Sequence, residues 1–132
     1  MQRRASRKVE FHFPSPDEGN KQARINPHLF DWVVENLLRN ALDAMEGKGN
    51  ISAEIYDDKD YVYIDISDTG KGIPANKFKT VFQPGFTTKK RGWGLGLSLA
   101  KRIIEEYHSG KIFVKRSEEG KGTTFTIQLP RA

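Results

Sequence analysis

The chain has 132 residues, no cysteine and a net charge of +5. A chain of this length forms one compact domain with a hydrophobic core of its own. The composition excludes disulfides, cysteine-rich zinc sites and thiol nucleophiles, and the sequence contains no apolar stretch near the roughly 20 residues of a membrane span and no signal-peptide pattern.

Most of the net positive charge lies at the N-terminus. Arginine and lysine residues among the first eight positions contribute four of the five charges. We interpret residues 1–7 as a basic tail or the remnant of an interdomain linker, in preference to a nucleic-acid-binding arm. Residues 8–130 are then the domain, for which we expect no nucleic-acid partner and no direct membrane contact.

The first elements are a strand and a long helix. Residues 9–13 alternate apolar and polar side chains, which predicts a half-buried strand, and a loop follows over 14–20. Asn26 and Pro27 suit the N-cap and the first position of a helix that runs to about Glu46. The expected apolar face of this helix contains Phe30, Val33, Val34, Leu37, Leu38, Ala41 and Met45.

The opposite face of this helix has an unusual polar composition. Asn36, Asn40 and Asp43 are spaced i, i+4, i+7, so they line up along it. Asparagine is a poor helix former because its side chain competes with the backbone, so a polar ligand would explain the pair. The amide oxygen of Asn40 could coordinate Mg²⁺, which prefers oxygen ligands. The alternative is an ordinary exposed polar face.

A hairpin follows the helix. Residues 51–55 and 61–67 alternate as two strands around a turn at 57–60. The second strand ends at Asp68, which Gly-Lys-Gly follows closely. A carboxylate there can accept a hydrogen bond from the exocyclic amine of adenine, and the glycines let the backbone pass close to the base. The alternative reading of Asp68 is an Asx turn that leaves the strand.

The remaining elements complete a two-layer fold. We expect a short helix over 76–81, an irregular loop over 82–92, a long helix from about Gly94 to Tyr107, and a hairpin of 112–114 with 124–129. The residues of the second helix expected to face inward are Leu95, Leu99, Ile103 and Tyr107. This order predicts an α+β fold, a two-layer α/β sandwich whose mixed, mostly antiparallel five-stranded sheet is covered on one face by helices.

Three glycines precede or open the second long helix, at Gly92, Gly94 and Gly96. Glycine allows close approach of an anion, and the first N–H groups of a helix are unpaired and lie at its positive end. Threonine and basic side chains over 87–91 add further phosphate-binding groups. The pattern therefore favours a triphosphate site, with a tight loop-to-helix turn as the alternative.

These segments resemble four ordered sequence boxes of one family. Residues 36–44 resemble the N box, 68–73 the G1 box, 81–89 the F box and 92–97 the G2 box of the catalytic, ATP-binding domain of two-component sensor histidine kinases, in the GHKL or Bergerat-fold superfamily. The resemblance covers roughly residues 8–130. The Asn-Ala-Leu-Asp-Ala-Met stretch and the Thr-Thr-Lys segment look most like the nitrogen-regulation and oxygen-sensing branch.

The resemblance implies ATP and Mg²⁺ as cofactors. Asn40 would be the metal ligand, Asp68 would bind the adenine amine, and Lys89 would contact phosphate. The residues expected to bind the nucleotide are Asn36, Asn40, Asp43, Asp68, Gly70, Gly72, Ile73, Phe82, Thr87, Thr88, Lys89, Gly92, Gly94, Leu95, Gly96 and Leu97. The residues expected to act in catalysis are Asn36, Asn40 and Lys89.

The same resemblance implies partners and a location. The γ-phosphoryl group would pass to a histidine on a separate dimerising helical hairpin of the full-length kinase, and from there to a response regulator. We expect this chain alone to be a monomer in the cytoplasm, either as a cytoplasmic protein or as the cytoplasmic portion of a membrane-bound sensor. The chain departs from many such kinases at Asp43 and Ala44, where a basic residue and an aromatic or histidine are usual.

The alternatives are an ATPase or a protein-serine kinase of the same superfamily and, in a different class, a non-catalytic regulatory module that binds nucleotide or only docks partners. The ATPases place a glutamate general base four residues before the metal-binding asparagine, whereas this chain has Asn36 there. An amide cannot take a proton from water, and the adjacent Glu35 points about 100° away around the helix. The F box and the Thr-Thr-Lys segment argue against the serine kinase.

Overall fold

The computed structural model describes residues 9–12, 25–46, 48–83 and 96–131. The elements are β1 (Val9–His12), α1 (Pro27–Met45), β2 (Gly49–Asp57), β3 (Tyr61–Asp68), the 3₁₀ turns η2 (Ala75–Lys77) and η3 (Thr80–Phe82), α2 (Gly96–Arg102), the π-helical turn η4 (Ile103–Tyr107), β4 (Lys111–Glu118) and β5 (Gly122–Pro130). Within these ranges no helix is both long and apolar enough to cross a membrane.

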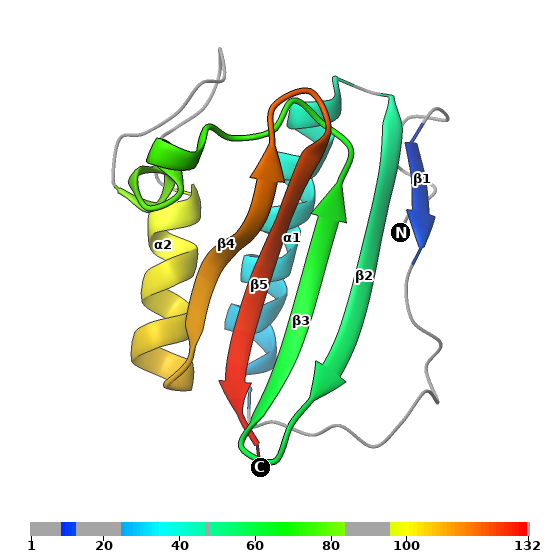
Figure 1. Ribbon diagram of the computed structural model, residues 1–132. Helices are drawn as coiled ribbons and strands as arrows, with labels where there is room; N and C mark the ends of the chain where they lie inside the picture. The colour runs from blue at the N-terminus through cyan, green and yellow to red at the C-terminus, as the bar shows by residue number, and fades with distance from the viewer. Residues whose placement is uncertain (1–8, 13–24, 47, 84–95, 132) are drawn as a thin grey trace.

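The strands form one mixed sheet in the order β1-β2-β3-β5-β4. The four long strands β2, β3, β5 and β4 are antiparallel to their neighbours, and the short β1 is added parallel to β2 at the edge. Figure 1 shows α1 passing behind the strands and α2 lying beside it next to β4. The predicted two-layer sandwich with a mostly antiparallel sheet is therefore confirmed.

The core lies between this sheet and the helices. Asn26 caps α1 by accepting a hydrogen bond from the Leu29 N–H at 3.1 Å, as its position predicts. The helix buries one face, as its periodicity predicts, and alternate residues of the strands meet it. The buried residues of α1 are Val33, Leu37, Ala41 and Met45, and those of the strands facing them include Ile51, Ile66, Ile112, Phe125 and Ile127.

Two predicted elements are wrong in detail. Residues 76–81 form no α-helix but contribute to η2 and η3, because so short a segment gains too few hydrogen bonds to offset helix nucleation. In the second long helix Leu99 is 40% and Tyr107 64% exposed. Ile103 is 6% exposed, as predicted, but the other buried positions there are Ala100 and Ile104, each one residue beyond an expected inward position.

The wider π turn explains the exposure of Tyr107. More residues per turn over η4 shift the inward position from Tyr107 to His108, which is 6% exposed. The His108 ring lies between hydrogen bonds from the Asn26 N–H to Nε2 (3.0 Å) and from Nδ1 to the Ile103 carbonyl (3.1 Å). His108 thereby ties the end of η4 to the N-cap of α1.

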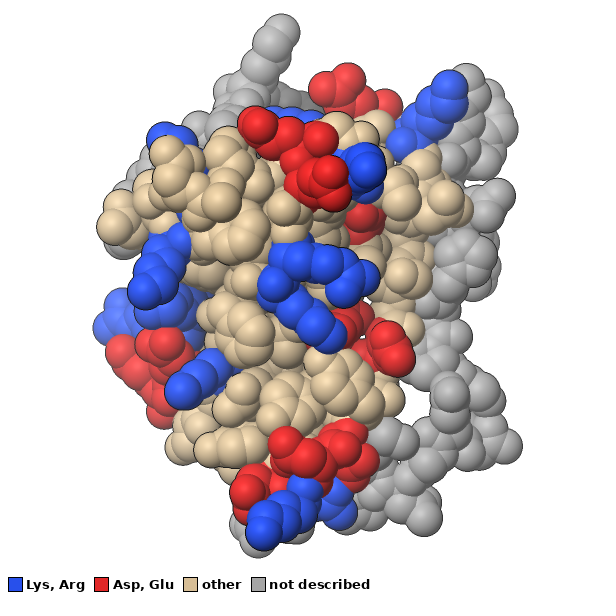
Figure 2. All heavy atoms as spheres, viewed as in Figure 1, with Lys and Arg blue, Asp and Glu red and all other residues tan. Residues whose placement is uncertain are grey.

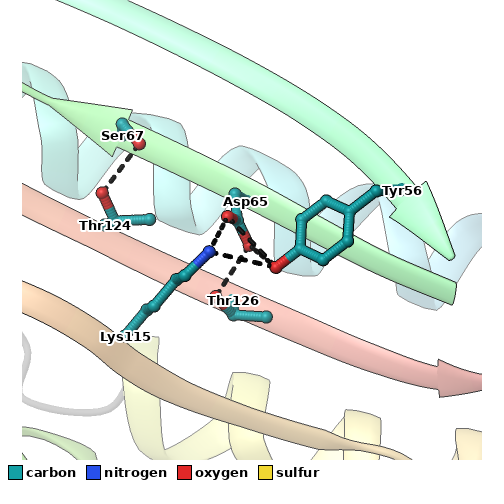
Figure 3. A network of polar contacts seen from close by, with 6 residues as sticks. All are labelled: Tyr56, Asp65, Ser67, Lys115, Thr124 and Thr126. Carbon is teal, nitrogen blue, oxygen red and sulfur yellow. Dashed lines mark hydrogen bonds and ion pairs between the residues drawn. The ribbon is translucent and has the colours of Figure 1, made fainter. Parts of the chain in front are cut away.

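The sheet face away from the helices contains a buried carboxylate, Asp65, which is 5% exposed. It accepts hydrogen bonds from Tyr56 Oη (3.1 Å), Thr126 Oγ1 (2.8 Å) and Lys115 Nζ (2.9 Å) (Figure 3). Figure 2 shows this face, with Lys and Arg side chains near its middle, acidic side chains beside them, and further acidic and basic side chains toward its ends. These three polar partners compensate for the desolvation of Asp65, and two of them, Lys115 and Tyr56, also contact each other (3.2 Å).

We expect Lys115→Met to lower the free energy of unfolding by about 1–2 kcal/mol, because it removes one charged hydrogen bond from a carboxylate that stays buried. The Asp65 hydrogen bond, and then that of Tyr56, raises the pKa of Lys115. The stabilisation is therefore complete below the ordinary pKa of 10.5 and is lost as the pH rises through the raised value. Urea unfolding at pH 7 measures the loss, and Lys111→Met, at an exposed lysine of β4, should cost much less.

Candidate nucleotide site

Asp68 lies at the end of β3, where its carboxylate is fixed by backbone donors. The Gly70 N–H donates to Asp68 Oδ1 at 2.8 Å, and the Thr123 N–H of the neighbouring β5 also bonds the carboxylate. Burial raises the pKa of Asp68 above the ordinary 3.8, while these two hydrogen bonds oppose the rise. The Asx turn that was the alternative reading of Asp68 is thus present, and an ionised carboxylate retains lone pairs for a further donor.

The loop after Asp68 packs directly against the C-terminal end of α1. Lys71 N–H donates to the Ala44 carbonyl at 3.1 Å. A Cβ atom at Gly70 would lie 2.7 Å from the backbone carbon and oxygen of Ala44, which is closer than a side chain allows. Glycine at position 70 is therefore what lets the Asp68 loop touch the helix.

About two helical turns before Ala44, α1 also contacts α2, through Asn36. A Cβ atom at Gly96, the first residue of α2, would lie 2.7 Å from Asn36 Oδ1. The Asn36 side chain is held by its own Nδ2 donating to the Trp32 carbonyl at 3.0 Å. Asn36 therefore fixes where the backbone of α2 begins relative to α1.

Asn40 lies between these two contacts. Asn36, Asn40 and Ala44 are spaced i, i+4, i+8 on α1, so they share one side of the helix about one turn apart. The Asn40 side chain is half-buried. Along this side of α1, Asn36 contacts the start of α2 and Ala44 contacts the Asp68 loop, about 12 Å apart, with the Asn40 amide between them.

The turn between β4 and β5 braces the same loop from the other side. Gly120 N–H donates to the Lys71 carbonyl at 2.8 Å, and Ile73 N–H donates to Ser117 Oγ at 2.6 Å. Gly72 has φ +82° and packs so closely on the Glu118 carbonyl that no Cβ would fit there. Residues 70–73 are therefore held between α1 and the β4–β5 hairpin.

The predicted site residues divide into three groups. Asn36, Asn40, Gly96 and the Asp68–Ile73 loop come together as described above. Phe82 is 7% exposed and packs edge-on against Phe125, with ring centroids 6.0 Å apart, and Asp43 is exposed near the end of α1, while the half-buried Leu97 packs against the core. The remaining predicted residues, Thr87, Thr88, Lys89, Gly92, Gly94 and Leu95, lie outside the described residues.

Two hydroxyl residues beside Asp68 were not among the predicted site residues. Thr123 pairs with Asp68 across β3 and β5, and Ser117 pairs with Thr123 across β5 and β4. The strand predicted over 112–114 stops short of Ser117, whereas β4 continues to Glu118. The strand register places Thr123 beside Asp68 and Ser117 beside Thr123, and no local pattern in the sequence specifies that register.

Comparisons with known proteins agree with this arrangement. The sequence profile of the family described as "Histidine kinase-, DNA gyrase B-, and HSP90-like ATPase" matches residues 26–132. The chain is 47% identical over 105 residues to sporulation kinase E of Bacillus subtilis, covering 79% of this chain and 14% of that protein. It is 42% identical over 126 residues to the sensor histidine kinase ZraS of Salmonella typhimurium, covering 95% of this chain and 26% of that protein.

The fold is shared with solved histidine kinases. The mycobacterial sensor histidine kinase MprB superimposes with a TM-score of 0.84 at 26% identity, covering 98% of this chain and 88% of that one. Histidine kinase ThkA, in a crystal structure with the response regulator protein TrrA, superimposes with a TM-score of 0.76 at 28% identity, covering 94% and 34%. With its profile match over 26–132, the chain belongs to the family of histidine kinase-, DNA gyrase B- and HSP90-like ATPases.

Proposed function

We propose that this chain binds Mg-ATP and donates the γ-phosphoryl group to a histidine on a separate phosphoacceptor domain, which then supplies a response regulator. The proposal rests on one side of α1. This side contacts the start of α2 at one end and the loop of the partly buried Asp68 carboxylate at the other, with the Asn40 amide between them. The named kinases among the relatives support it, although the chain spans 14–26% of their lengths.

Asp68 would recognise the base. Its carboxylate, held by Gly70 and Thr123, would accept a hydrogen bond from the 6-amino group of adenine. Guanine carries an oxygen at that position, which has no hydrogen to donate to Asp68. The close packing of Gly70 and Gly72 would keep the loop backbone out of the plane of the base.

Asn36, Asn40 and the start of α2 would hold the triphosphate end. The half-buried amide of Asn40 fits Mg²⁺, which accepts a single protein oxygen when phosphates and water supply its other ligands. When bound, the ion neutralises phosphate charge. The backbone N–H groups at the start of α2 would favour the same anion, so that this chain positions the γ-phosphoryl group for an external nucleophile.

The acceptor histidine would come from outside the described residues. Both ring nitrogens of the buried His108 are in hydrogen bonds. His28 is exposed in the first turn of α1, two turns before Asn36. Neither position suits an in-line acceptor beside Asn40, and His12 lies on the edge strand β1, which supports transfer to a helical hairpin elsewhere in a longer kinase.

Finer assignments rest on the sequence alone. We infer from the resemblance of residues 40–45 and 87–89 that the protein belongs to the nitrogen-regulation and oxygen-sensing branch, and that its sandwich is of the Bergerat type. A monomeric state of the isolated chain and a cytoplasmic location follow from the same resemblance. Sedimentation of the purified chain at micromolar concentration tests whether it is a monomer.

Calorimetric titration of the chain with Mg-ATP tests the proposed function. Saturable heat that returns to a flat baseline is expected, because Asn36 occupies the position of the ATPase general base. Absence of binding would remove the nucleotide assignment altogether. Sustained heat after saturation would mean steady hydrolysis and would move the protein to the ATPase branch.

Glu35→Gln is expected to leave both ATP affinity and the low hydrolysis rate unchanged within about twofold. Glu35 is exposed and lies about 100° around α1 from Asn36, so it cannot reach a water beside the γ-phosphate. Phosphate release over hours measures the rate, with Asp31→Asn as a matched exposed acid on the same helix. A tenfold loss confined to Glu35→Gln would identify a general base and favour the ATPase.

A further inference from the structure

The hydroxyl of Ser117 is the meeting point of three contacts beside the candidate nucleotide site. It accepts a hydrogen bond from the Ile73 N–H at 2.6 Å. It also lies 3.1 Å from the Gly122 carbonyl and 2.7 Å from Thr123 Oγ1. One side chain thus links the Asp68 loop to both strands of the β4–β5 hairpin.

The chemistry of these partners decides where the protons lie. Ser117 has a single hydroxyl proton, and the Gly122 carbonyl can only accept one. One arrangement satisfies all three contacts: Ser117 donates to Gly122 O, and it accepts from both the Ile73 N–H and the Thr123 hydroxyl. The proton of Thr123 is then committed to Ser117, so the free side of Thr123 Oγ1 is an acceptor.

This acceptor lies next to the Asp68 carboxylate. Asp68 and Thr123 are directly paired across β3 and β5, and Thr123 and Ser117 across β5 and β4. Directly paired residues point to the same face of a sheet, with Cβ atoms about 5 Å apart. Two acceptors therefore stand side by side at the end of the sheet where the base would bind, because the Thr123 proton is committed to Ser117 and an ionised Asp68 carboxylate only accepts.

We propose that Ser117 is a positioning residue that determines purine specificity, by holding the Thr123 hydroxyl as an acceptor beside Asp68. This inference rests on the proposed function and extends it. A 6-amino purine has two N–H hydrogens, one for Asp68 and one for Thr123 directly or through a water. A 6-oxo purine presents lone pairs to the same two acceptors and is rejected.

The test compares Mg-ATP and Mg-GTP affinities of the chain by calorimetry. Ser117→Ala releases the Thr123 proton, which can then turn toward a 6-oxo group. We expect Mg-ATP affinity to fall roughly fivefold while Mg-GTP affinity holds or rises, so that the preference for ATP narrows. Ser117→Thr keeps a hydroxyl and should keep the wild-type preference.

Ser67→Ala is the matched control, and Thr123→Val is a second variant that tests the same acceptor. Ser67→Ala removes a similar hydroxyl pair, Ser67 with Thr124 at 2.8 Å (Figure 3), one position before Asp68 on the other sheet face, and should change neither affinity. Thr123→Val removes the acceptor itself and should narrow the preference even if Ser117→Ala does not fold.

Each result decides between distinct conclusions. An unchanged preference in Ser117→Ala and Thr123→Val overturns the inference and leaves the proposed function intact. Equal losses for both nucleotides also overturn it, because a purely structural brace would weaken binding without regard to the base. Wild-type chain that binds neither nucleotide removes the proposed function itself, and the inference with it.

Discussion

Asn40→Ala is expected to lower Mg-ATP affinity at least about tenfold, because removing even an outer partner of a metal site costs roughly 10- to 100-fold. Asn40 lies on α1 between Asn36, which contacts Gly96, and Ala44, which contacts Gly70. The loss of affinity should require Mg²⁺. In EDTA, the variant and the wild type should bind ATP with the same affinity. Titrations with and without Mg²⁺ measure the two quantities separately.

Two further variants separate metal binding from folding. Asn40→Asp retains an oxygen ligand and should keep most of the increase in ATP affinity that Mg²⁺ produces. Arg39→Ala changes an exposed neighbour on the same helix and should leave both affinities unchanged. If Asn40→Ala still binds ATP more tightly with Mg²⁺ than without, Asn40 is no metal ligand and the metal site lies elsewhere.

Asp68→Asn is expected to weaken Mg-ATP binding roughly 10- to 100-fold, because it removes a charged acceptor from the adenine amine. The loss should be smaller for Mg-GTP, since the 6-oxo group gains an amide donor at residue 68. The discrimination between the two nucleotides is therefore the decisive quantity. Unchanged discrimination would mean that Asp68 serves only as the Asx turn that its contact with Gly70 provides.

The same substitution should stabilise the chain in the absence of nucleotide. Burial raises the pKa of Asp68, so the folded state binds the proton more tightly than the unfolded state does. The resulting stability is complete below the ordinary pKa of 3.8 and is lost as the pH rises through the raised value. The Asp68→Asn variant has no carboxylate to ionise, so its advantage in Tm over the wild type should grow as the pH rises above about 4.

Asp58 provides a control of opposite sign. Its hydrogen bond from Tyr63, followed by those from the Asp60 and Tyr61 backbones, lowers its pKa. Its contribution to stability is therefore present above the ordinary 3.8 and is lost as the pH falls through the lowered value. Asp58→Asn should lower the Tm at pH 7, which distinguishes the effect at Asp68 from a general response to removing a carboxylate.

The local elements were predictable from the sequence because short-range physics specifies them. Asn26 caps α1 as predicted, and the 3.6-residue period of its apolar side chains correctly identified the buried face. Alternation correctly placed β2 and β3 and brought Asp68 to a strand end. The order of these elements was enough to predict a helix layer on a mostly antiparallel sheet, since few arrangements bury both apolar faces.

Tertiary structure decided what lies beside Asp68. The sequence by itself determined the polar face of α1 with Asn36 and Asn40, the strand that ends at Asp68, and the glycines that follow Asp68. Strand register and chain packing then set which groups meet: Ser117 and Thr123 reach Asp68 only through pairing across three strands, and the π turn after α2 buries His108 in place of Tyr107. Such contacts join residues distant along the chain, so their geometry depends on the whole packed core rather than on any local pattern.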